Sequence, residues 1–136
     1  MSEKPNRFVL DTSALLAMIE AEEGGKRVYD VLSRETTYIP FVSLLELRYI
    51  TLREKGQAEA DQRYVLLKNT KAEILWELNE PILLTAARLK ASYRISLGDS
   101  IVAAFAAQTN AVLLHKDPEY EALKSEIALE ALPYKR

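Results

Sequence analysis

The sequence predicts an α/β protein, specifically a three-layer α/β/α sandwich with a mainly parallel sheet of about five strands. Short apolar, β-prone segments alternate along the chain with longer segments whose apolar residues recur at helical spacing. The connections between successive strands are long enough to cross over a sheet, which parallel pairing requires. Strands this short and apolar are typical of a sheet that helices cover on both faces.

The first half of the chain is expected to contain two strands and four helices. The glycines at positions 24, 25 and 56 are expected to end helices. In order, the predicted elements are a strand at residues 7–10, helices at 12–22 and 26–34, a strand at 36–39, a helix from 40 to about 55, and a helix at 57–68.

The second half is expected to add three strands and three helices. Asn79 can cap a helix that has Pro81 in its first turn, and a break at residues 96–98 precedes a very apolar, buried helix. In order, the predicted elements are a strand at 72–76, a helix from 79 to about 93, a helix at 99–108, a strand at 111–114, a short helix beginning at Pro118, and a strand at 127–132.

Composition limits the classes of function. The 136 residues fit one domain, residues 1–136. The absence of cysteine excludes disulfides and thiolate metal sites, and the single histidine, His115, excludes a multi-histidine site. A net charge of −2 is not that of a protein that holds nucleic acid by charge alone. Because no apolar run suits a transmembrane helix or a signal peptide, we expect a cytoplasmic protein without membrane contact.

Two carboxylates follow predicted strands. Asp11 comes directly after the first strand, and Asp117 lies three residues past the fourth. Open α/β folds bind ligands at the carboxyl edge of a parallel sheet, where both residues are expected. Each also has a structural alternative, because Asp11 can cap the helix that follows it and Asp117 precedes Pro118 as a typical cap does.

Two further carboxylates lie on predicted helices. Glu46 has Val42 and Ile50 as helical neighbours, and an unpaired charge on such an apolar stripe is costly. The alternative is a glutamate at the edge of the stripe that reaches solvent. Asp99 heads the buried helix, and its alternative is a capping box with Ser96 three residues before it.

Taken together, Asp11, Glu46, Asp99 and Asp117 indicate a metal site more strongly than any of them does alone. Carboxylates held close repel one another and raise some pKa values, and a divalent cation relieves that repulsion. Mg²⁺ prefers oxygen ligands and keeps several waters, one of which can attack phosphorus. We therefore expect a Mg²⁺- or Mn²⁺-dependent enzyme that cleaves a phosphodiester.

The segments around these acids resemble a known family. They read VLDTS at residues 9–13, SLLEL at 43–47, LGDSIVAA at 97–104 and LLHKDP at 113–118. As a set they are similar to PIN domains and, more narrowly, to the VapC-type toxins of toxin–antitoxin pairs. The resemblance spans nearly the whole chain, with the four acids in family order and spacing.

The resemblance implies a five-stranded parallel sheet, a Mg²⁺- or Mn²⁺-dependent endoribonuclease, a homodimer, and inhibition by a small antitoxin protein. It makes Asp11, Glu46, Asp99 and Asp117 the catalytic and metal-site acids, and Ser13 the residue that supports the first of them. Many members of the family have Thr or Ser at the position of His115. This histidine could orient Asp117, contact phosphate or be inert.

Two other functions stay open. A small metal-dependent phosphatase of the kind with an Asp after its first strand would need a second Asp where Ser13 stands. A catalytically inactive PIN-like module that binds RNA or protein would be expected to lack at least one of the acids. Lys116 is the best candidate for contact with RNA phosphates because it adjoins Asp117. The basic residues considered for that contact are Arg48, Arg53, Lys55, Lys90, Arg94 and Lys116.

Overall fold

Five parallel strands form one sheet in the order β3-β2-β1-β4-β5 in the computed structural model, which describes residues 7–135. The predicted sheet is therefore confirmed. The N-terminal residues, for which no signal peptide is expected, lie almost wholly outside the described part. The strands are β1 (Arg7–Leu10), β2 (Thr36–Pro40), β3 (Glu73–Leu75), β4 (Val112–His115) and β5 (Leu129–Ala131).

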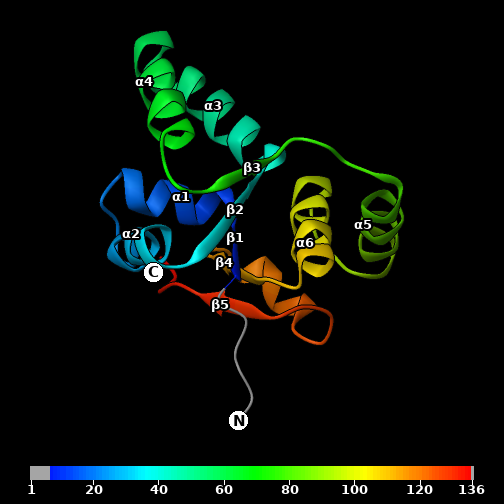
Figure 1. The fold of residues 1–136 in the computed structure, drawn as a ribbon. Coiled ribbons are helices and arrows are strands. Elements are labelled where there is room, and N and C mark those ends of the chain that lie inside the picture. The colour runs from blue at the N-terminus through cyan, green and yellow to red at the C-terminus, as the bar shows by residue number, and fades with distance from the viewer. Residues whose placement is uncertain (1–6, 136) are drawn as a thin grey trace.

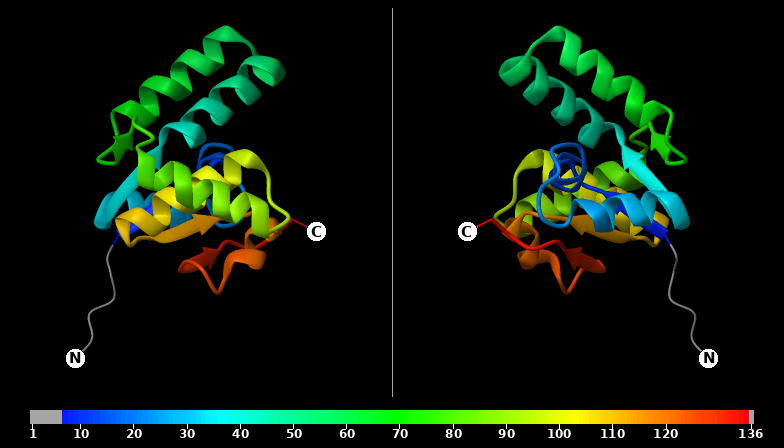
Figure 2. Two further views of the ribbon diagram at one scale, coloured as in Figure 1. Left: turned by 90° about the vertical axis from the view of Figure 1, so that its right-hand side faces the viewer. Right: turned by 90° about the vertical axis from the view of Figure 1, so that its left-hand side faces the viewer.

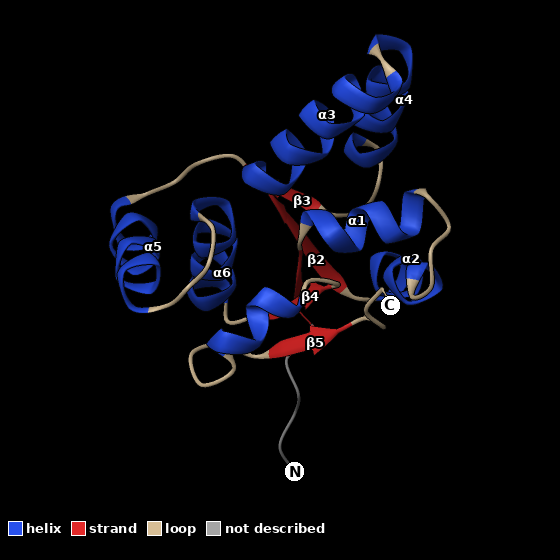
Figure 3. Ribbon diagram, turned by 180° about the vertical axis from the view of Figure 1, so that it is seen from behind, coloured by secondary structure: helices blue, strands red, loops and turns tan. Residues whose placement is uncertain are grey.

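Helices cover both faces of the sheet, as the sequence predicts (Figure 1). On one face lie α1 (Thr12–Ile19) and α2 (Gly25–Arg34), and on the other α5 (Glu80–Ser92) and α6 (Leu97–Thr109). A hydrophobic core lies on each face of the sheet, and alternate residues of β1 point into different cores. Phe8 and Leu10 pack with residues of α1 and α2, and Val9 packs with residues of α6. Figure 3 shows the same layers from behind.

A helical hairpin follows β2. It consists of α3 (Phe41–Lys55) and α4 (Gln57–Lys68), joined at Gly56. Figure 2 shows this hairpin extending away from the sheet. The short helix predicted at Pro118 is a 3₁₀ helix, η1 (Pro118–Leu123), directly after β4. None of the helices in residues 7–135 is both long and apolar enough to cross a membrane.

The first helix ends three residues earlier than predicted. It stops at Ile19, and Ala21 adopts the left-handed conformation (φ 53°). The backbone N–H groups of Ala21 and Glu22 donate to the carbonyls of Met18 and Ala17, which is the Schellman pattern of helix termination. Glycine usually occupies this left-handed position, so an alanine gave no signal in the sequence.

The predicted break at residues 96–98 is also wrong. Only Ser96 lies outside the helix, and α6 begins at Leu97. The Ser96 hydroxyl oxygen accepts a hydrogen bond from the backbone N–H of Asp99 at 3.1 Å, which makes Ser96 the helix cap. Asp99 therefore lies in the first turn of α6, next to the carboxyl ends of the central strands.

Candidate active site

Asp11 joins β1 to α1 and is almost fully buried, with 3% of its surface exposed. Its Oδ2 atom accepts hydrogen bonds from the backbone N–H of Ser13 at 3.0 Å and from the Ser13 hydroxyl at 2.6 Å. One oxygen of Asp11 thus caps the helix, which leaves the other to face the interior of the site. The capping and functional interpretations of Asp11 are compatible in this geometry.

Ser13 also links the first strand to the fourth. Its hydroxyl oxygen accepts a hydrogen bond from the backbone N–H of Lys116 at 2.8 Å while the hydroxyl donates to Asp11. The loop after β4 is therefore tied to the loop after β1 through a single side chain. This contact places Asp117 on the same edge of the sheet as Asp11.

Tyr120 of η1 is part of the site, although nothing in the sequence indicates it. Its hydroxyl lies 2.6 Å from Oδ1 of Asp11 and 3.0 Å from Oδ1 of Asp99. The side chain is fully buried. A tyrosine three residues after Asp117 reads as an ordinary core residue, and only the fold brings its hydroxyl between two acids.

Asp99 is not the reciprocal partner of a capping box. In a capping box, the acid would accept a hydrogen bond from the backbone N–H of Ser96. That N–H donates instead to Oε1 of Glu119 at 2.8 Å. The Asp99 carboxyl group faces Tyr120. Burial and the negative charge of Asp11 raise the pKa of Asp99 to about 8, against a partial lowering by the hydrogen bond with Tyr120.

Glu46 of α3 is half-buried and points toward the first turn of α6. The hydroxyl of Thr12 donates to its Oε1 at 2.7 Å. Burial raises the pKa of Glu46, the charges of Asp11 and Asp117 add to that effect, and the Thr12 hydrogen bond opposes it. Glu46 is therefore not a surface glutamate at the edge of an apolar stripe.

Asp117 is the N-cap residue of η1, as its sequence alternative predicts. Its Oδ1 atom accepts a hydrogen bond from the backbone N–H of Glu119 at 2.9 Å, which makes it a helix cap. Its charge nevertheless contributes to the raised pKa values of Glu46 and Asp99. Asp117 thus lies close enough to act on the other acids of the site.

His115 is completely buried at the end of β4. Its Nδ1 atom accepts a hydrogen bond from the backbone N–H of Asp117 at 3.1 Å, and its ring packs against Tyr120 with centroids 5.0 Å apart. Burial lowers the pKa of His115, so the ring is neutral with its proton on Nε2. Of the three roles considered for it, a contact with phosphate is excluded by burial, and the observed contact is with the backbone of Asp117.

The prediction that Lys116 contacts RNA phosphates is not supported, because its ammonium group is bonded within the protein. Its Nζ atom donates to the backbone carbonyl of Glu23 at 2.8 Å and pairs with Glu22 at 3.4 Å, and only 5% of its side chain is exposed. Arg48 is likewise paired, with Asp61 at 2.9 Å. The exposed basic residues from the set considered are Arg53, Lys55, Lys90 and Arg94.

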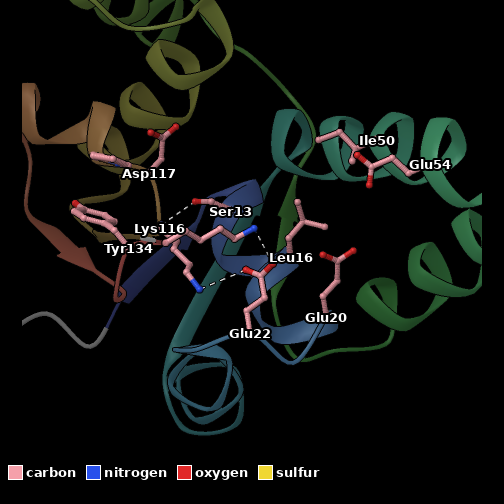
Figure 4. A pocket seen from close by; sticks show the side chains of 11 residues that line it. Ser13, Leu16, Glu20, Glu22, Ile50, Glu54, Lys116, Asp117 and Tyr134 are labelled. Atoms are coloured by element: carbon pink, nitrogen blue, oxygen red, sulfur yellow. Dashed lines mark hydrogen bonds and ion pairs between the residues drawn. The ribbon is translucent and has the colours of Figure 1, made fainter.

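Of the four acids, Asp117 lines an open cleft of about 540 Å³. Figure 4 shows Asp117 and Tyr134 on one side of it and Ile50 and Glu54 of α3 on the other. Ser13, which hydrogen-bonds to Asp11, also lines the cleft and is therefore reached by solvent from it.

The donor atoms fit a hard divalent cation. Asp11, Glu46, Asp99 and Asp117 offer only oxygen, which Mg²⁺ and Mn²⁺ accept. In the part of the chain that the structure describes, no three Asp, Glu or His side chains converge closely enough to hold an ion between them. Because Mg²⁺ keeps several waters and is often bound by one or two carboxylates, a closed cage is not required.

A family model for the PIN domain matches residues 8–126. The chain belongs to the PIN-domain family. All four acids lie within the matched residues, as do the supporting residues Ser13, His115 and Lys116 named from the sequence. No curated protein matches this chain.

Solved structures with the same PIN fold include several toxin–antitoxin proteins. VapBC2 from Rickettsia felis, bound to a DNA fragment from its promoter, is 16% identical with a TM-score of 0.76 over 93% of this chain and 99% of that chain. VapBC-1 from nontypeable Haemophilus influenzae is 20% identical with a TM-score of 0.72 over 92% and 97%. VapC20 from Mycobacterium tuberculosis, a toxin that cleaves the sarcin-ricin loop, is 12% identical with a TM-score of 0.71 over 93% and 99%. At these identities the likeness is one of fold, and that fold is the predicted one.

Proposed function

We propose that this PIN domain is a metal-dependent endoribonuclease and the toxin of a type II toxin–antitoxin pair. The observation that carries the proposal is the close placement of acids from separate segments of the chain: the Tyr120 hydroxyl contacts both Asp11 and Asp99, and Glu46 lies against Gly98, the residue before Asp99. The charges of Asp11 and Asp117 both raise the pKa values of Glu46 and Asp99. Such repulsion is what a divalent cation relieves.

One or two of Asp11, Glu46, Asp99 and Asp117 would bind Mg²⁺ or Mn²⁺ directly, and the others would bind the waters around the ion. When bound, the ion supplies an acidified water for attack on phosphorus and charge stabilisation for the leaving oxygen. The chain's own residues orient the acids: Ser13 fixes Asp11, and Thr12 fixes Glu46. Burial of Asp11 and Asp99 limits the water around them, which strengthens the electrostatic interactions in the site.

The alternatives fit the geometry less well. A phosphatase with paired aspartates would need a carboxylate at position 13, where the Ser13 hydroxyl instead donates to Asp11. A module without catalytic activity would not need four acids whose charges act on one another. The PIN fold supports the nuclease proposal over the phosphatase.

The decisive experiment incubates the pure protein with structured RNAs in Mg²⁺, in Mn²⁺ and in chelator. We expect cleavage only with metal, and none by Asp11→Asn, which keeps the helix cap but loses the charge. Asp61→Asn is the matched control because Asp61 is an exposed residue of α4 whose side-chain partners are Arg48 and Gln57. Cleavage in chelator, or full cleavage by Asp11→Asn, would contradict the proposal. Hydrolysis of a phosphomonoester without RNA cleavage would favour the phosphatase.

A small antitoxin is the proposed protein partner, as in the toxin–antitoxin complexes of the same fold. The surface that supports this is an apolar groove of about 490 Å³ between α1, α2 and α4, whose lining includes Ile19, Leu32 and Leu66. Expression of this chain alone should arrest the growth of the host cells, and co-expression of its antitoxin should relieve that arrest. Leu66→Asp, on the exposed rim of the groove, should weaken the complex and leave RNA cleavage intact.

The proposed homodimer and cellular location are further expectations. Leu45, Tyr49 and Leu52 of α3 and Val65 of α4 are exposed apolar residues on the projecting hairpin, a surface typical of self-association. Light scattering at several concentrations should give twice the mass of the 136-residue chain. We expect the protein to act in the cytoplasm, because the proposed substrate is RNA. We also expect residues 1–136 to form one domain, which the match over residues 8–126 supports.

A further inference from the structure

Among residues 7–135, the hydroxyl of Tyr120 is the one side-chain group that hydrogen-bonds to two of the four acids. It reaches Oδ1 of Asp11 at 2.6 Å and Oδ1 of Asp99 at 3.0 Å. These acids come from different parts of the chain, after β1 and at the start of α6. Their separation is thus set through a third element, η1.

The position of this hydroxyl is fixed by the core. Tyr120 is 0% exposed and belongs to the cluster that contains Val102, Leu113 and Leu123. Its ring packs against His115, and its backbone N–H donates to the carbonyl of Asp117 at 3.2 Å. A side chain held on all sides cannot follow the carboxylates if they move, so it acts as a rigid spacer between them.

The remaining oxygen of Asp11 is also held. Its Oδ2 atom accepts two hydrogen bonds from Ser13, so Ser13 and Tyr120 together fix the plane of the Asp11 carboxylate. Without the Tyr120 hydroxyl, Asp11 and Asp99 would lose the one group that both of them contact, and when both are ionised their repulsion would favour a larger separation. Partners of this kind around a metal ligand typically change metal affinity by about 10–100-fold when they are removed.

We propose that Tyr120 is a positioning residue of the metal site, which holds Asp11 and Asp99 at the separation that a divalent cation requires. The inference rests on the proposed function, because it takes these acids to be the metal ligands. It assigns to η1 a role in metal affinity that is separate from the capping by Asp117. The hydroxyl, rather than the aromatic ring, carries this role.

The test is direct titration of Mn²⁺ by calorimetry, without RNA, on the wild type and Tyr120→Phe. The phenylalanine ring can keep the contact with His115 and loses only the hydroxyl. We expect the dissociation constant for Mn²⁺ to rise at least about tenfold. Tyr93→Phe is the matched control, because the Tyr93 hydroxyl donates to Glu126 at 2.8 Å and does not contact the four acids. This control should bind Mn²⁺ like the wild type.

A rescue variant separates positioning from folding. Tyr120→p-aminophenylalanine replaces the hydroxyl with an amino group that can donate to both carboxylates, and it should restore most of the Mn²⁺ affinity. If Tyr120→Phe binds Mn²⁺ within twofold of the wild type, or if the rescue variant binds no better than Tyr120→Phe, the inference is wrong. If the wild type itself binds no Mn²⁺ at millimolar concentration, the proposed metal site is wrong and the inference falls with it.

Discussion

Glu46 of α3 and Gly98 of α6 lie against each other across the site. A Cβ atom on Gly98 would be 2.6 Å from Oε2 of Glu46, which is closer than real contacts allow. The absence of a side chain at position 98 is therefore what lets the Glu46 carboxylate approach the first turn of α6. That turn also contains Asp99, so the glycine determines how close two of the four acids can come.

Gly98→Ala should separate activity from stability. The added methyl must displace the end of the Glu46 side chain, which is flexible, so the fold should tolerate it. Alanine is also favoured over glycine in a helix by about 0.5–1 kcal/mol. We expect unchanged or higher thermal stability and at least a tenfold loss of RNA cleavage. Thermal melts and cleavage rates on one preparation check this, and a variant that keeps full activity would show that the position of Glu46 is unimportant.

Glu46→Gln should damage activity far more than stability. The glutamine oxygen can still accept the hydrogen bond from Thr12, and the loss of a buried charge removes repulsion from Asp11 and Asp117. We expect RNA cleavage to fall at least about tenfold with no loss in melting temperature. Glu73→Gln, on an exposed strand residue, is the control for a change of one charge. Equal cleavage by the two variants would make Glu46 a structural residue.

His115 should act through its Nδ1 acceptor. His115→Leu fills much of the same space but leaves the backbone N–H of Asp117 without its partner, at a cost of about 1–3 kcal/mol. His115→Asn places an amide oxygen near Nδ1 and can keep the hydrogen bond. We expect the leucine variant to lose at least tenfold in cleavage, because small displacements of site residues are costly, and the asparagine variant to lose less. If both variants lost RNA cleavage equally, the role of His115 would be the packing of its ring and not the hydrogen bond at Nδ1.

The sequence predicted the layers and the parallel sheet because the signals for them are local. The strands are apolar runs of a few residues, and Asn79 and Pro81 mark the start of α5 as expected, with Asn79 accepting from the backbone N–H of Ile82 at 3.0 Å. A helix end was harder to predict where a residue other than glycine adopts the left-handed conformation that ends the helix. Ala21 in the left-handed conformation is the clearest case, since nothing in its residue type indicates it.

The site was predicted in part for a similar reason. Acids that follow strands can be read from the chain, and Asp11 and Asp117 lie on the predicted edge. The partners of those acids depend on side-chain positions that only the packed structure defines. Tyr120 between Asp11 and Asp99 is one example, and the replacement of Asp99 by Glu119 at the backbone of Ser96 is another. The lysine expected to meet RNA is paired with Glu22 because the loop between α1 and α2 folds over it.

Asp99 should make the metal-free protein less stable as the pH rises. Its pKa of about 8 in the folded state lies far above the value of about 3.9 that it has in an unfolded chain. Folding therefore favours the protonated acid. The resulting contribution to stability is complete below about pH 4 and is lost progressively as the pH rises to about 8. In chelator, the melting temperature of the wild type should accordingly fall between pH 5 and pH 9.

Asp99→Asn removes the contribution of Asp99 to this dependence. The variant should melt at a higher temperature than the wild type without metal and at a lower temperature with metal. In chelator at pH 9 the variant should melt higher than the wild type, because it carries no charge beside Asp11, and near pH 6 the difference should shrink. In Mn²⁺ at a hundredfold excess over its dissociation constant, the wild type should gain about 2.7 kcal/mol and the variant much less. A helix cap would behave differently, since its loss lowers stability with or without metal. Melts of both proteins across this pH range, in chelator and in millimolar Mn²⁺, separate the two cases. A variant that is less stable in every condition, beside a wild type without any metal-dependent shift, would remove Asp99 from the proposed metal site.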